Sequence, residues 1–132
     1  MKILALDLGD VHTGMALSDE LHIIASPYTT VKTHELISFL QELFAKERIS
    51  TTVVGYPKTL RGTESAQTQK VVSFKEELQQ LFPTITWVLW DERLTSKQAQ
   101  RIKPAKTKEE KNRSHAIAAS LILEGYLDYL RF

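Results

Sequence analysis

Acidic side chains stand at the ends of two apolar runs of the sequence. Asp7 closes the run that begins at Lys2, and Asp91 and Glu92 follow the run 85–90. In an open α/β sheet the carboxyl ends of parallel strands share one crevice, so these carboxylates are expected to lie there together. Carboxylate oxygens suit Mg²⁺, and two or three are enough because the ion keeps several of its waters. The pattern predicts a site for Mg²⁺ or Mn²⁺ with Asp7, Glu92 and Asp91 as ligands.

Divalent ions held in this way can hydrolyse a phosphodiester, because one ion activates a water while another stabilises the leaving oxygen. His115, near the start of the last expected helix, joins Asp7 and Glu92 as the third catalytic candidate, either as a ligand or as a proton carrier. Each residue also has a structural alternative. Asp7 could cap a turn, Asp91 and Glu92 could form a solvated strand end, and His115 could pack against its own helix.

Positive charge is concentrated in one segment, although the whole chain has a net charge of only +1. Residues 93–113 include eight Lys and Arg but only two Glu, whereas the rest of the chain is net acidic. Such asymmetry favours contact with a polyanion, and nucleic-acid phosphates fit this description. The candidate phosphate-binding residues are Arg93, Lys97, Arg101, Lys106 and Lys108. The alternative is a solvated linker, because 103–113 lacks apolar periodicity, contains Pro104 and is predicted to be a loop.

The hydrophobic pattern indicates which elements position these groups. Strands are expected at 2–8, 13–18, 21–28 (ending near Pro27), 49–55 and 85–90, and helices at 33–44, 63–81, 95–102 and 114–130, with Thr33 as the first N-cap. Three successive strands followed by β-α alternation predict a mixed sheet, with an antiparallel hairpin, parallel crossovers and helices on both faces.

Size and composition narrow the class of protein. The 132 residues are expected to form a single domain, 1–132, that can bury a full core. The absence of cysteine excludes disulfides, thiolate metal sites and a cysteine nucleophile. No apolar run approaches the roughly 20 residues that span a bilayer, and an acid interrupts the N-terminal apolar run, so a cytoplasmic protein without membrane contact is expected.

Four ordered blocks together resemble the YqgF family, also called RuvX-like, which is described as Holliday junction resolvases and as pre-16S rRNA nucleases. The blocks are LDLGDVHTGMALSD at 6–19, VVGYPKTLRGTE at 53–64, WDERLTS at 90–96 and AASLILEGYL at 118–127. The resemblance implies a ribonuclease H-like α/β fold with a five-stranded mixed sheet. It also implies Asp7 and Glu92 as acidic site residues, a divalent cation, and RNA or branched DNA as the substrate.

The sequence departs from the family at three points. His115 stands where the family usually has an aspartate before its Ala-Ala pair, Val11 and His12 replace basic residues, and Tyr56 replaces a leucine. Imidazole is a poor ligand for Mg²⁺ although it binds transition metals, so His115 could weaken the activity.

The leading hypothesis is a metal-dependent endonuclease that processes the 5′ end of pre-16S rRNA. A Holliday junction resolvase, or a weakened module that binds nucleic acid without cutting it, is the alternative. A phosphotransferase related to sugar kinases is a third reading, but those enzymes need two lobes and a longer chain. The sequence leaves open whether the protein is a monomer or a homodimer, although a two-fold branched substrate would favour a dimer.

Overall fold

The computed structural model describes residues 1–56, 66–91 and 108–131, with the backbone alone for 108–113. The elements are β1 (Lys2–Leu8), β2 (His12–Ser18), β3 (Ala25–Lys32), a 3-10 turn (Thr33–Glu35), α1 (Leu36–Lys46), β4 (Ile49–Tyr56), α2 (Ala66–Leu81), β5 (Thr86–Asp91) and α4 (Lys108–Arg131). The expected helix 95–102 lies outside the described residues.

The five strands form one mixed sheet in the order β3-β2-β1-β4-β5. The β1–β2 and β2–β3 pairs are antiparallel, whereas β1–β4 and β4–β5 are parallel. This arrangement confirms the predicted hairpin part and parallel part. It also brings the carboxyl ends of β1, β4 and β5 to one edge of the sheet, which is where the predicted acids were expected.

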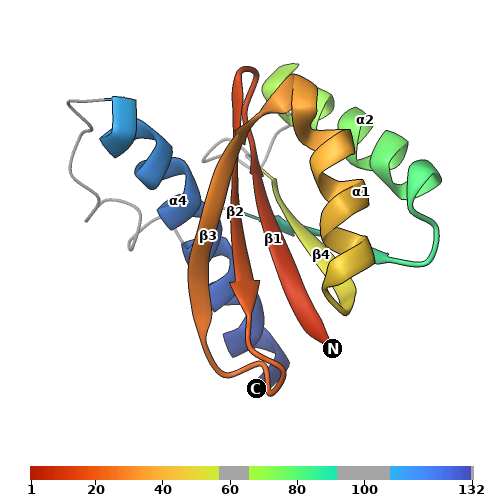
Figure 1. Cartoon of the computed structure of the whole chain (residues 1–132), viewed down its shortest axis with the longest axis vertical. Helices are drawn as coiled ribbons and strands as arrows, with labels where there is room; N and C mark the ends of the chain where they lie inside the picture. Colours follow the sequence, from red (N-terminus) through yellow and green to blue (C-terminus); the bar gives the residue numbers. More distant parts are fainter. Residues whose placement is uncertain (57–65, 92–107, 132) are drawn as a thin grey trace.

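Helices cover both faces of the sheet, as predicted, with α1 and α2 on one side and α4 on the other (Figure 1). Strand alternation assigns each side chain to a face. Leu4 and Leu6 of β1 enter the core under α1 and α2, whereas Ile3 and Ala5 enter the core under α4. Because Asp7 follows Leu6, the alternation directs its carboxylate to the α4 face.

Small residues beneath α4 let the helix approach the sheet closely. Ala5 and Ala16 are fully buried there, and Ala119 of the helix packs against them. At Gly14 the backbone of α4 comes so near that a Cβ atom would overlap the carbonyl group of His115. Only glycine fits at position 14, so this residue determines how close α4 lies to the sheet and where along the sheet it packs.

Thr33 ties the β1–β2 turn to the start of the α1 side. Its hydroxyl donates to the carbonyl of Gly9 at 2.7 Å, and its backbone N–H donates to the carbonyl of Val11 at 2.8 Å. Because that hydroxyl proton is already used, Thr13 is the donor in the 2.9 Å contact between the two threonine hydroxyls. The prediction of Thr33 as the cap of an α-helix was therefore wrong: it holds the turn, and α1 begins at Leu36 after a 3-10 turn.

The third strand was predicted at 21–28 but spans 25–32. The residues before it form a turn, because the Asp19 carboxylate accepts hydrogen bonds from the backbone N–H groups of Leu21, Ile23 and Ile24 at 2.7–3.3 Å. Pro27 does not end the strand. β3 is an edge strand and its register shifts beside Pro27, which are the conditions under which a sheet accepts proline.

The last helix begins earlier than predicted, at Lys108 rather than at 114. The prediction of a loop was therefore wrong for 108–113. That segment has no apolar stripe, but it consists mainly of good helix formers and has two acids in its first turn, which favour a helix start. Across the described part of the chain, no helix has the length and apolar character needed to cross a bilayer.

We expect Gly14→Ala to destabilise the protein by about 1–3 kcal/mol or more, because α4 must move off the sheet to make room for the methyl group. Urea unfolding would measure this change. Ser26→Ala on the exposed edge strand β3 is the control and should stay within about 0.5 kcal/mol of the parent protein. An unfolding midpoint of Gly14→Ala equal to that of the parent would contradict the close contact with α4.

Candidate active site

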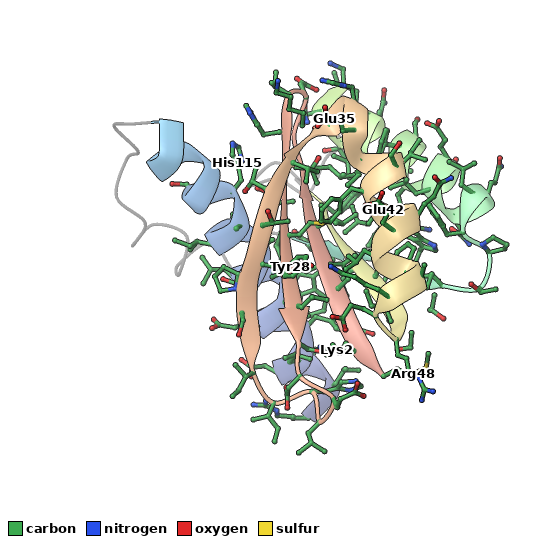
Figure 2. All side chains as sticks on the ribbon, viewed as in Figure 1. Lys2, Tyr28, Glu35, Glu42, Arg48 and His115 are labelled. Carbon is green, nitrogen blue, oxygen red and sulfur yellow. The ribbon has the colours of Figure 1, made fainter. Side chains whose placement is uncertain are left out.

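Asp7 and His115 meet at the carboxyl end of β1, although 108 positions separate them in the sequence. Asp7 is the register partner of Gly14, and the backbone of α4 at His115 lies directly on that glycine. The His115 Nδ1 atom lies 3.9 Å from Asp7 Oδ2, and the two side chains are 37% and 25% exposed. Figure 2 shows His115 between α4 and the upper part of the strands. The structure thus brings together two of the three predicted catalytic residues.

The pair has a defined electrostatic character. At 3.9 Å the two side chains form an ion pair when the ring is protonated, and this distance is longer than a direct hydrogen bond. Interaction with the Asp7 carboxylate raises the pKa of His115 above its ordinary value of 6.5, whereas partial burial of the ring acts in the opposite direction. The carboxylate therefore favours the protonated form of the ring.

His12 is a second imidazole at this site that the sequence reasoning did not select. Its ring stacks on that of His115 with centroids 5.8 Å apart and an interplanar angle of 23°. His12 and Gly14 are two positions apart on β2, so both lie on the α4 face. The register partner of His12 is Lys32 of β3, so a lysine lies beside this histidine in one row across the neighbouring strands. The sequence did hold a signal for His12. Residues two positions apart on a strand share a face, and His12 lies two positions from Gly14, the cross-strand partner of Asp7.

The acids of β5 are placed differently. Asp91 is the last residue of that strand, at the same edge of the sheet as Asp7, and it pairs in register with Tyr56. Trp90 packs into the core under α4, so alternation directs Asp91 to the opposite face, under α1 and α2. Alternation therefore places Asp91 and Asp7 on opposite faces of the sheet, whereas His115 pairs with Asp7.

The remaining predicted site residues cannot be placed from the described ranges. Glu92, Arg93, Lys97, Arg101 and Lys106 all lie outside them. Lys108 belongs to the first turn of α4, but its side chain is not among those described.

At the Asp7–His115 pair, the groups that could bind a metal ion are one carboxylate and one imidazole. Within residues 1–56, 66–91 and 114–131, no group of three His, Asp or Glu side chains is arranged to hold a metal ion. A mixed oxygen and nitrogen pair suits Mn²⁺ or another transition ion better than Mg²⁺. Asp7 and His115 can therefore supply two ligands, and a cation site would need further ligands.

Comparison with known proteins gives concordant matches. A family model named RuvX and described as "Holliday junction resolvase" matches residues 1–129. The "Putative pre-16S rRNA nuclease" of Flavobacterium johnsoniae is 36% identical over 136 residues, covering 99% of both chains. The protein of that name from Christiangramia forsetii is 40% identical over 131 residues, covering 96% of this chain and 97% of that protein.

A solved structure supports the assignment of the fold. RuvC of Thermus thermophilus, in complex with a Holliday junction substrate, superposes with a TM-score of 0.65 at 17% identity, covering 99% of this chain and 96% of that one. At this identity the likeness concerns the fold alone. The five-stranded mixed sheet with helices on both faces is thus the ribonuclease H-like, RuvC-like arrangement, as expected.

We expect NMR titration of metal-free protein to give His115 a pKa above 6.5, and Asp7→Asn to lower it by removing the carboxylate charge. Asp128→Asn, an exposed acid near the other end of α4, is the control and should leave the pKa of His115 unchanged. Because protonation is favoured in the folded state, the pair stabilises the fold fully below pH 6.5, and this is lost as the pH rises through the raised pKa. Equal His115 titration curves in the parent and Asp7→Asn would refute the pairing.

Proposed function

The chain belongs to the RuvX family, and from that premise we propose that it is a metal-dependent endonuclease of structured nucleic acid, with precursor 16S rRNA as its substrate. The observation that carries the proposal is the Asp7–His115 pair at the carboxyl end of β1. The pair consists of a carboxylate and a titratable ring, and both are accessible to a substrate. The full-length similarity to proteins named for pre-16S rRNA supports the choice of polymer.

Asp7 and His115 are the described residues that would hold a divalent cation, with Glu92 as the further predicted ligand; Asp91 lies on the opposite face of the sheet and is left out of this ligand set. Bound there, the ion would supply a Lewis acid for hydrolysis of the phosphodiester. The imidazole donor moves the expected preference from Mg²⁺ toward Mn²⁺.

As the alternative to binding the cation, His115 is placed to transfer a proton. Its Nδ1 atom faces Asp7, and this orientation leaves Nε2 as the ring nitrogen that can serve the substrate. Stacking on His12 restricts the orientation of the ring. A protonated ring can donate to the oxygen that leaves phosphorus, and such transfer contributes about 10²–10⁴-fold to a rate.

Phosphate binding is assigned to basic residues, some of them near this pair in the described structure and others predicted from the sequence. His12 and Lys32 form one row beside the site. Lys108 precedes His115 by seven residues, which is about two helical turns or 10 Å along α4. The proposal therefore gives Arg93, Lys97, Arg101, Lys106 and Lys108 the role of holding the polymer while Asp7 and His115 act on one linkage.

A cleavage assay tests this function. Labelled precursor 16S rRNA ends and a four-way DNA junction would be offered with Mg²⁺, with Mn²⁺ or with chelator. We expect metal-dependent cuts in the RNA, a rate at least about 100-fold lower for Asp7→Asn, and a parental rate for the control Asp128→Asn. His115→Asp should shift the preference from Mn²⁺ toward Mg²⁺ because it restores an oxygen donor. Cleavage by Asp7→Asn at the parental rate would overturn the mechanism, and cleavage of the junction alone would reassign the substrate to branched DNA.

A second candidate function is recognition of nucleic acid without cleavage. The imidazole at position 115, where the family usually has an acid, is the observation that favours it. This candidate requires salt-dependent binding and no metal-dependent product in the same assay, even from His115→Asp.

A further inference from the structure

A cavity of about 680 Å³ opens on the α1 and α2 side of the sheet, at the edge where β1 ends. Its apolar lining comes from Leu8, Val71 and the half-buried ring of Phe74. Asp10 and Lys70 also line the cavity and form an exposed ion pair at 3.8 Å. The Asp7–His115 pair lies on the opposite face of the same sheet edge, so the cavity is separate from the site described above.

We propose that this cavity receives an unpaired base of the substrate strand; the inference rests on the proposed function and specifies the class of substrate. Its volume lies within the range of small-molecule sites, roughly 300–1,000 Å³. An aromatic ring beside aliphatic groups suits the flat face of a base. Gln69 and Ser73 of α2 line the cavity, and an amide and a hydroxyl there can hydrogen-bond the edge of a base.

The charges of the lining favour a base over a phosphate. Two carboxylates, Asp10 and Glu77, outnumber the single cation Lys70. A phosphate would therefore be repelled, whereas the neutral ring of a base with amino donors would be accepted. The Asp10–Lys70 pair is exposed and long, so it gives way to a ligand at little cost.

The chain connects the cavity directly to the candidate active site. Leu8, Gly9 and Asp10 line the cavity and are the three residues that follow Asp7. Consecutive Cα atoms are 3.8 Å apart, so the Cα atoms of Asp7 and Asp10 lie within about 11 Å of each other. One nucleic-acid strand rises about 3.4 Å per nucleotide when stacked, so this reach corresponds to about three nucleotides.

The turn that separates the two sites is held rigidly. Thr33 binds the carbonyls of both Gly9 and Val11, and a Cβ atom at Gly9 would overlap the carbonyl oxygen of His12. The distance between a phosphate at Asp7 and a base in the cavity is therefore set by the fold. We infer a substrate with an unpaired or mismatched base within about three nucleotides of the cleaved linkage; a fully paired duplex keeps its bases stacked and would leave the cavity unused.

Ser73→Trp tests the inference, because Ser73 is an exposed residue of the lining and a bulky ring there fills the cavity without entering the core. Gln80→Trp is the matched control, an exposed position on the same helix outside the cavity lining. The probes are two RNA hairpins of equal length, with 2-aminopurine either paired or opposite a mismatch. Binding is measured with chelator present, by affinity and by 2-aminopurine emission, so that no cleavage occurs.

We expect the parent and Gln80→Trp to bind the mismatched hairpin about 10-fold more tightly than the paired one and to change its emission. Ser73→Trp should bind both hairpins alike. Phe74→Leu keeps the apolar volume but removes the ring, so it should reduce the emission change. Equal affinity of the parent for the two hairpins, or an undiminished preference in Ser73→Trp, would overturn the inference. Because these measurements involve no cleavage, they can fail while the nuclease function holds, and they can succeed while it fails.

Discussion

The contact between Gly14 and the backbone of α4 is the constraint on which the candidate site depends. A helix that lies directly on a strand must have no side chain beneath it at the point of closest approach, and Gly14 provides that point. Gly14 is also the cross-strand partner of Asp7, so the residue of α4 at this contact is necessarily the neighbour of Asp7. That residue is His115. The proximity of the two side chains thus follows from one close backbone contact and one register pair.

At the end of β1, strand alternation places two successive residues in different environments. Asp7 faces α4, whereas Leu8 faces α1 and α2 and lines the cavity there. The turn that follows is fixed by Thr33 from the start of the α1 side, so neither environment can shift independently of the other. A strand of nucleic acid that crosses this edge would meet a titratable pair on one face and an apolar hollow on the other.

The chemistry of the pair differs from that of two carboxylates held side by side. Like charges at short distance raise one another's pKa values, whereas the Asp7 carboxylate and the His115 ring stabilise each other when the ring is protonated. The ring is also a nitrogen donor, and His12 stacks against it. Under the proposed function, a histidine at this position would change both the cation that the site prefers and the proton that it can carry.

The sequence by itself determined the mixed sheet and the order of its elements, because these depend on local periodicity, and it singled out Asp7 and His115 as candidate site residues. It did not determine where Thr33, Pro27 and residues 108–113 would belong. A threonine hydroxyl can cap a helix or hold a distant turn, and a proline ends a strand only where its amide is needed. Tertiary structure alone decided that Asp91 faces away from Asp7, that His12 stacks on His115, and that a cavity opens beyond Leu8. Each of these depends on strand register and on the distance between α4 and the sheet. Register is defined only between two paired strands, so one segment of sequence does not determine it.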